Sequence, residues 1–538
     1  MANRFIGGES GHRSVFGGTR SKPQIIGYSL TFAVGVFGVM NFGWPGLLAG
    51  VAVGIIVAVL TTGTRRGTVL ERKARRQRWK KRQHTGADRY VPYTPEAMEA
   101  AEAEAAQAGK KDRPAILGAV RERPDGADGM GWLDARAGLP GIAWHAQEGE
   151  GQYLSVAFAV GGGLRGAEDS RQQNLTQEGF GKLLATHAPA GSLVRRFQLM
   201  TRAFPPDLAL NEAWVEGRLD PEAPEDAVAS YQQALERAGT GAFVQRHIVV
   251  ACWPLGSEFL ALAERHAPGR DGWRALMASE IRDMQRALVA ARLGTVKALS
   301  ARAVVAMMLH QQNPSRLPLM VAGVDPRKMG LASRDEWNAH CVTDTEPFTG
   351  QEVTWYHRTA RISSANMEVV ERSPFWHLAL THAPGQNVRT ISFNVELAPA
   401  DQARKLAGRD VVRDTSAMYS KQKKGQIVDA STDVNLAAAM ARGNDLKPGS
   451  GHHGVYFVGY VTVSATTQRG VSEASRLMES AAKEGAGIQR LEWLDSYQSA
   501  ASGFTWPIGR GIREAHVTLG ARAMDLLAGN VEKEEKVA

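Results

Sequence analysis

An uncharged, strongly apolar stretch runs from residue 24 to 63 and reads QIIGYSLTFAVGVFGVMNFGWPGLLAGVAVGIIVAVLTTG. One straight helix of that length would reach about 60 Å, which is roughly twice the hydrocarbon thickness of a bilayer. The segment NFGWPG at 41–46 interrupts it, because Asn, Gly and Pro favour a turn and proline can open a second helix. The pattern predicts two short transmembrane helices, roughly 24–41 and 45–63, that form a hairpin.

Small residues recur every four positions along the second of these helices. They are Gly46, Gly50, Gly54 and Ala58. Such a face lets another helix approach closely in lipid, although glycine is also simply common in membrane helices. We interpret the four residues as a packing face.

Positive charge flanks both ends of the apolar stretch. Because cytoplasmic flanks carry the excess of Lys and Arg, we expect both termini and the bulk of the chain on the cytoplasmic side of the plasma membrane. A cleaved signal peptide fits poorly, since a second apolar segment follows the first at once.

The stretch RRGTVLERKARRQRWKKR, residues 65–82, holds ten Lys/Arg and one Glu. The whole chain has a formal charge of +9, so this run leaves residues 83–538 slightly acidic, without the charge expected of a DNA-binding body. We expect the run to orient the hairpin and contact anionic lipid, with nucleic acid as the alternative ligand. The candidate contact residues are Arg65, Arg66, Arg72, Lys73, Arg75, Arg76, Arg78, Lys80, Lys81 and Arg82.

The region after the basic run begins with an Ala/Glu-rich stretch, residues 96–112, that reads as a solvated helix or linker. From residue 113, strand and helix patterns alternate. Strands are predicted at 151–160, 192–204, 243–253, 352–364, 387–399, 454–465 and 488–495. Helices are predicted at 175–188, 224–239, 270–294, 374–383, 400–420, 434–443 and 470–485.

Each half of this region runs strand, helix, strand, helical segment, strand, helix. LVRRFQLMTRAFPPD and VRTISFNVELAPAD occupy the same place in the two halves. The order predicts an α+β fold made of two similar units, with a ferredoxin-like unit as the candidate. The expected boundaries are 1–23 N-terminal tail, 24–63 hairpin, 64–112 basic segment and linker, 113–335 first unit, 336–510 second unit and 511–538 tail.

Motifs for catalysis or cofactor binding are not found in the sequence. Gly181-Lys182 lacks the surrounding residues of a P-loop, and GGGLRG at 161–166 matches neither that motif nor G-x-G-x-x-G. His452 and His453 have no carboxylate or Cys ligands nearby, and KQKKGQ at 421–426 reads as a short basic loop. We therefore expect no enzyme activity, no cofactor and no metal.

The layout resembles an actinobacterial family of conjugation-associated membrane proteins with two transmembrane helices. In that family a PrgI/VirB-like hairpin precedes a region similar to the non-ATPase N-terminal half of the VirB/TraC-type secretion ATPase. The matching pieces here are the hairpin, the basic run and three fragments. The fragments are DARAGLPGIAWHA (134–146), PGQNVRTISFNVELAPADQARKLAGRD (384–410) and SAASGFTWPIG (499–509).

The resemblance implies a non-enzymatic component of a type IV secretion or DNA-conjugation apparatus. Its partners would be a separate secretion ATPase and other membrane subunits, within a hetero-oligomer. Two alternatives remain open from the sequence. One is a membrane component of a type VII secretion system, and the other is a membrane-tethered nucleic-acid-binding protein that uses residues 65–82.

Overall fold

The computed structural model describes residues 4–6, 22–61, 68–147, 151–161, 169–205, 218, 220, 222–239, 243–316, 323–345, 350–372, 376–385, 387–423 and 430–511. Arg65, Arg66 and the expected tail from residue 512 lie outside these ranges.

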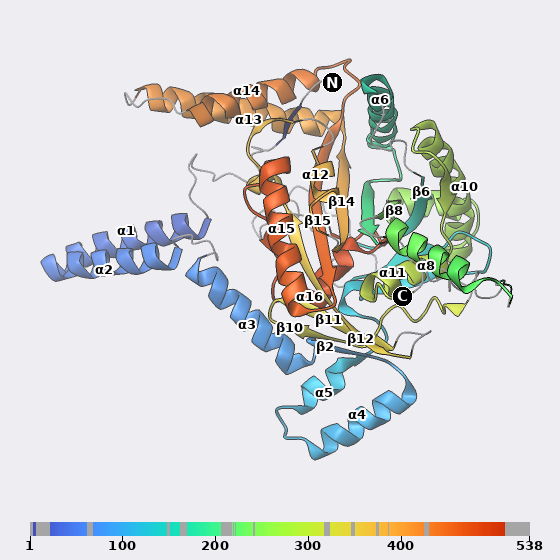
Figure 1. Cartoon of the computed structure of the whole chain (residues 1–538). Helices are drawn as coiled ribbons and strands as arrows, with labels where there is room; N and C mark the ends of the chain where they lie inside the picture. The colour runs from blue at the N-terminus through green and yellow to red at the C-terminus, as the bar shows by residue number, and fades with distance from the viewer. Residues whose placement is uncertain are drawn as a thin grey trace.

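The fold is mixed α+β and is built on one 14-stranded sheet, with a helical pair that projects away from it (Figure 1). The N-terminal elements precede the two halves of the sheet. They are β1 (Arg4–Ile6), α1 (Lys22–Phe42), α2 (Trp44–Thr61), α3 (Val69–Thr85), β2 (Arg89–Pro92), α4 (Pro95–Gln107), α5 (Arg113–Ala119) and β3 (Val120–Arg121).

The first half of the sheet and its helices span residues 130–312. Its elements are β4 (Met130–Asp134), β5 (Ile142–His145), β6 (Tyr153–Val160), α6 (Ser170–His187), β7 (Arg196–Phe204), α8 (Glu225–Gly239), β8 (Val244–Pro254), α9 (Ser257–Glu264), α10 (Gly269–Ala290), β9 (Val296–Ala298) and α11 (Ala301–Gln312).

The second half spans residues 333–502. Its elements are β10 (Ser333–Glu336), β11 (Ala339–Thr345), β12 (Glu352–Ile362), β13 (Val370–Arg372), α12 (Leu378–Thr381), β14 (Val388–Ala398), α13 (Ala400–Lys423), α14 (Ala430–Asp445), β15 (Gly454–Ala465), α15 (Gln468–Ala486), β16 (Glu492–Trp493) and α16 (Gln498–Ser502).

The strand order is the same in both halves when it is read outward from the centre. The first half runs β7-β8-β6-β5-β4, with β9 also paired to β6, and the second runs β14-β15-β12-β11-β10, with β16 also paired to β12. The two halves join where β7 and β14 pair antiparallel, with Leu199 opposite Phe393. Beyond β10, strand β2 pairs antiparallel with β10, and β3 pairs parallel with β2. One continuous sheet therefore contains two equivalent strand sets.

Alternation along the central strands separates two faces of the sheet. Phe197 on β7 and Val395 on β14 belong to an apolar core beneath α6, α9 and α10, and Ile391 belongs to the core beneath α15. Since successive residues of a strand point to opposite faces, Gln198 and Ser392 lie on the other face. Both are fully buried there, beneath the segment that follows α16.

The segment 503–511 crosses the polar face of the seam between the halves. Gln198 Nε2 donates to Ser392 Oγ at 2.9 Å and to the Trp506 carbonyl at 2.8 Å, while its Oε1 accepts from Gly509 N at 2.8 Å. Tyr460 of β15 donates to the Gly511 carbonyl. The segment therefore joins both halves of the sheet through buried hydrogen bonds.

Candidate membrane anchor and its junction with the sheet

Helices α1 and α2 run antiparallel beside each other and project from the body of the protein (Figure 1). Their outer surface is apolar and uncovered. Phe32, Met40 and Trp44 are 74%, 80% and 78% exposed. Large apolar side chains exposed to that extent along two adjacent helices would be covered by lipid or by another apolar surface.

Of the described helices, Trp44–Thr61 alone is both long and apolar enough to cross a membrane. Its 18 residues rise about 27 Å, close to the hydrocarbon thickness of a bilayer. Within α1, the apolar part Gly27–Phe42 is shorter. The structure thus contains one helix of spanning length and a shorter apolar helix packed against it.

The small residues of α2 lie against small residues of α1. A Cβ added to Gly46 would lie 2.0 Å from the Gly38 carbonyl oxygen, and one added to Gly50 would lie 2.7 Å from Gly35 Cα. A Cβ added to Gly54 would lie 3.0 Å from the Thr31 methyl carbon. The small-residue face anticipated from the sequence is therefore occupied by α1 of the same chain. Ala58, one turn further along, is half-buried.

Residues 69–82 of the basic run lie in α3, which stands between the hairpin and the sheet (Figure 1). One face of α3 docks on the second half of the sheet. Trp79 packs edge-on against Trp337, with ring centroids 6.0 Å apart, and Arg78 lies over the Tyr497 ring at 4.5 Å. Arg78 also donates a hydrogen bond of 2.8 Å to the Tyr497 hydroxyl.

Arg82 forms the centre of this junction. Its Nη2 donates to Asp335 at 2.5 Å, to Asp125 at 2.9 Å and to Ser499 Oγ at 2.9 Å. The side chain of Asp335 is 1% exposed and also accepts from Ser499 N and pairs with His340. Burial lowers the pKa of Arg82, but the carboxylates of Asp335 and Asp125 outweigh burial and raise its pKa above the usual value.

The expected lipid or nucleic-acid contact residues therefore divide into two groups. Arg82 is engaged in ion pairs within the protein, and Arg75 is half-buried. The opposite face of α3 is exposed. It carries Arg72, Lys73, Arg76, Lys80 and Lys81, which we call the α3 cation stripe. These five positions fall within about 180° of the helix circumference, at 100° per residue.

Strand β1 provides a second link between the anchor and the body. It precedes α1 and pairs antiparallel with β13, with Arg4 opposite Arg372 and Ile6 opposite Val370. Chain segments on both sides of the hairpin, β1 before it and α3 after it, thus contact the same α+β body.

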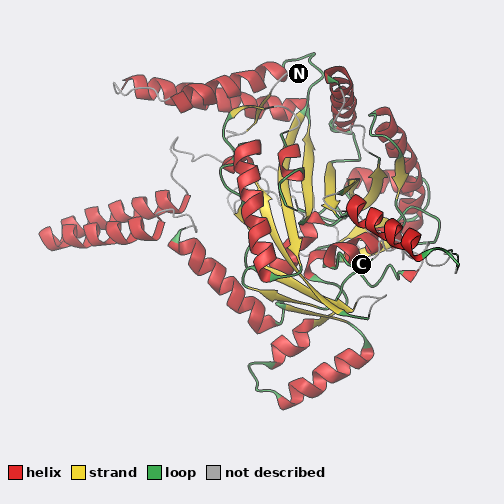
Figure 2. Ribbon diagram, viewed as in Figure 1, coloured by secondary structure: helices red, strands yellow, loops and turns green. Residues whose placement is uncertain are grey.

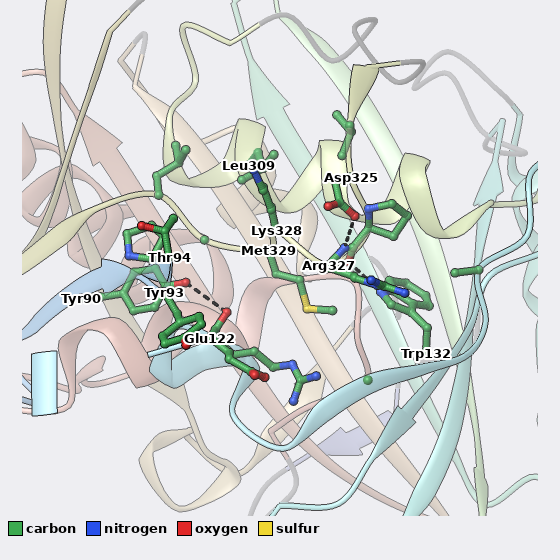
Figure 3. Close-up of a pocket in the computed structure, with 18 of the residues that line it drawn as sticks. Tyr90, Tyr93, Thr94, Glu122, Trp132, Leu309, Asp325, Arg327, Lys328 and Met329 are labelled. Carbon is green, nitrogen blue, oxygen red and sulfur yellow. Dashed lines mark hydrogen bonds between the residues drawn. The ribbon is translucent and has the colours of Figure 1, made fainter. Parts of the chain in front are cut away.

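A pocket of about 960 Å³ opens between β2, β4 and the loop 323–331 (Figure 3). Trp132 Nε1 donates to the Pro326 carbonyl at 2.8 Å, and Tyr90 donates to the Glu122 carbonyl at 3.3 Å. Aromatic and cationic side chains line the pocket. They are Tyr90, Tyr93, Trp132, Arg123, Arg316, Arg327 and Lys328. Arg316 is ion-paired with Asp344, and Asp325 and Glu122 offset part of the remaining positive charge.

Burial favours the neutral form of two side chains inside the body, His357 and Cys252. Burial lowers the pKa of His357 to about 3 and raises the pKa of Cys252 to about 11. His357 Nε2 lies 2.7 Å from the Gln312 carbonyl, so this nitrogen carries the proton and Nδ1 accepts from Ser464. Within the described ranges, no group of three or more His, Cys, Asp or Glu residues could hold a metal ion.

No protein-family model matches the chain, and a search of curated proteins returns none that matches it.

Sequence reasoning missed the junction and the seam. Asp125, Asp335 and Ser499 are separated from Arg82 by up to 417 residues, and nothing in their local sequence marks them as partners. The sequence does contain a signal for Gln198. It is a polar residue within an alternating strand pattern, and the equivalent position of the second half is also polar, Ser392.

Proposed function

We propose that this chain is a non-enzymatic, membrane-anchored scaffold. Within that class, we propose a structural component of a type IV secretion or DNA-conjugation apparatus that binds a separate secretion ATPase on the cytoplasmic side. The hairpin α1–α2 is the two-pass anchor in the plasma membrane, and the 14-stranded body is the partner-binding part. The family assignment rests on the sequence fragments given above.

One observation carries the scaffold assignment. An uncovered apolar hairpin is joined on both sides to a packed body, through β1 pairing with β13 and through the Arg82 junction. This arrangement supports a re-entering hairpin whose two ends face the same compartment. It also supports a body held close to α3, because α3 is docked on the body through the ion pair of Arg82 with the buried Asp335.

The body is proposed to be a tandem duplication of a ferredoxin-like unit. Counting the strands of each half as β6-β7-β8-β9 and β12-β14-β15-β16, both halves pair in the order 2-3-1-4. This is the order of the β-α-β-β-α-β unit. The antiparallel β7–β14 seam would then relate the two units by a local two-fold axis. Such a duplicated body without its own nucleotide motif is consistent with a scaffold that resembles the N-terminal half of the ATPase.

Affinity purification of the tagged chain from native membranes tests the proposal. In mild detergent, we expect a P-loop ATPase and other conjugation subunits at yields comparable to that of the chain. The test variant is Arg82→Ala, which disturbs the junction but leaves the hairpin sequence intact. It should reduce ATPase recovery more than the matched control Lys81→Ala does. Recovery of the chain alone, or with type VII components, would overturn the conjugation assignment.

Nucleic acid remains the second candidate ligand because of the α3 cation stripe. If the stripe binds DNA, affinity should fall steeply with salt, since each neutralised phosphate releases counterions. Replacing Arg72, Arg76 and Lys80 with Gln would then reduce the salt dependence, whereas Arg82→Gln would not. If the stripe serves lipid alone, the full chain in detergent should bind a duplex oligonucleotide no better than the triple variant does.

A further inference from the structure

The helical pair α13–α14 is a second element that stands clear of the sheet. It connects β14 to β15 and projects from the body on the same side as α1–α2 (Figures 1 and 2). Ala403 and Ala407 lie on the buried face of α13, with Asp410, which pairs with Arg442 of α14 at 3.6 Å. The sequence had predicted a loop at 421–426, but α13 continues to Lys423.

The exposed face of α13 carries cations and apolar residues in one line. Its members are spaced by three or four positions and therefore share one side of the helix. They are Lys405, Arg409, Val412, Ser416, Tyr419 and Lys423, and all six are exposed. Val412 is 67% exposed and Tyr419 is 63% exposed. From Lys405 onward this line contains no acidic residue.

Residue types in this combination are typical of a membrane interface. Tyrosine favours the headgroup region, where its ring and hydroxyl meet apolar and polar surroundings, and lysine interacts with anionic lipid. The last turns of α13 hold Tyr419, Lys421 and Lys423, whereas the acidic residues of the helix, Asp401, Asp410 and Asp414, all precede them.

The length of α13 is sufficient for such a contact. At 1.5 Å per residue, its 24 residues rise about 36 Å from the sheet. Helix α3, which joins the same body to the end of the hairpin, has 17 residues and rises about 26 Å. Because both helices lead away from the body on the anchor side, the free end of α13 can reach the plane at which α2 ends.

We propose that the free end of α13, around Tyr419 and Lys423, contacts the anionic headgroup surface of the membrane that holds α1–α2. The inference rests on the proposed membrane anchor, and it adds a second membrane contact that fixes the rotation of the body about the hairpin. One anchor would leave that rotation free to vary. Two separated contacts define a face of the body that is turned toward the cytoplasm.

Site-specific fluorescence quenching of the full chain in vesicles tests this contact. Cys252 and Cys341 are buried, so an introduced exposed cysteine can be labelled selectively. The probe positions are Gln422→Cys at the end of α13, Phe37→Cys on the hairpin, and Ala290→Cys at the end of α10 as the matched exposed control. The vesicles contain phosphatidylcholine and phosphatidylglycerol, with a nitroxide-headgroup lipid as the quencher.

We expect quenching at Gln422→Cys and Phe37→Cys, and little at Ala290→Cys. Removing phosphatidylglycerol, or combining Gln422→Cys with Lys423→Gln, should weaken the α13 contact by up to about fivefold per charge. Quenching at Phe37→Cys but only control-level quenching at Gln422→Cys would overturn the α13 contact and leave the anchor intact. That result would favour an acidic protein partner as the ligand of the same residues.

Absence of quenching at both positions would instead overturn the membrane anchor and, with it, this inference. Equal quenching of Gln422→Cys in vesicles with and without phosphatidylglycerol would contradict the role assigned to Lys423.

Discussion

Replacement of Arg82 by alanine should release α3 from the sheet. The change leaves the carboxylate of Asp335, 1% exposed, without its closest cation, and removes the link to Asp125 and Ser499. Breaking a buried ion pair by deleting one partner costs about 3–5 kcal/mol. Because the Arg82 side chain is still 16% exposed, we expect the lower end, about 3 kcal/mol.

Amide hydrogen exchange of α3 measures this loss without requiring global unfolding. A change of about 3 kcal/mol in the free energy of local opening corresponds to roughly hundredfold faster exchange. Lys81→Ala is the matched control, since Lys81 is exposed on the α3 cation stripe and neighbours Arg82 in sequence. It should change the exchange rates by about threefold at most.

A double-mutant cycle identifies the partner. If Arg82 acts through Asp335, then Asp335→Asn should add little to the effect of Arg82→Ala, because the two residues are in direct contact. Exchange rates in Arg82→Ala that match those in Lys81→Ala would refute the junction. Fully additive effects of Arg82→Ala and Asp335→Asn would refute the pairing.

Three further predictions concern the hairpin, the seam and acid stability. A disulfide should form between Gly27→Cys and Val57→Cys, because a Cβ on Gly27 would lie 3.7 Å from Val57 Cβ. Adding Gly50→Leu should abolish this disulfide, whereas adding Val51→Leu at an exposed position should not. Undiminished crosslinking in Gly50→Leu would contradict the helix contact. Gln198→Leu removes three buried hydrogen bonds and should make residues 503–511 sensitive to limited proteolysis, with Gln245→Leu, exposed on β8, as the control. Because the pKa of His357 is lowered to about 3 by burial, the unfolded chain takes up a proton below pH 6.5 that the folded protein does not. Stability should therefore fall as pH decreases from 6.5, by about 2 kcal/mol at pH 5 for this histidine, and urea unfolding should show a smaller loss in His357→Gln.

Local periodicity was sufficient to predict most helices and strands of the body. The strand expected at 454–465 is β15 at those residues, and the strand expected at 387–399 is β14 at Val388–Ala398. The helix expected at 470–485 is α15 at Gln468–Ala486, where Thr467 caps the start and Gly487, with a φ of +58°, ends it. These segments have strong patterns and clear end signals, so local chemistry determines them.

Other features depend on distant residues and could not be predicted. Tyr90, ahead of the expected start of folded sequence, is buried in β2 against β10. The segment 96–112 was read as a solvated helix or linker, and the helix is the outcome for most of it, since α4 spans Pro95–Gln107 and is mainly exposed. The pairing of β7 with β14 joins segments about 190 residues apart, and no periodicity within either strand specifies its neighbour. The basic run was predicted as a charged surface because composition cannot reveal that Arg82 meets the buried carboxylate of Asp335 and the partly buried carboxylate of Asp125.

Topology of the hairpin tests the central claim most directly. Two positions are replaced singly by cysteine: Phe42, the last residue of α1 beside the turn to α2, and Gln83, on the exposed side of α3. Each variant is treated in intact cells with a membrane-impermeant maleimide. The proposed anchor predicts labelling at Phe42→Cys from outside the plasma membrane, and at Gln83→Cys only after the cells are opened. Labelling of both positions only after opening, together with extraction of the chain at alkaline pH, would contradict a membrane-spanning hairpin.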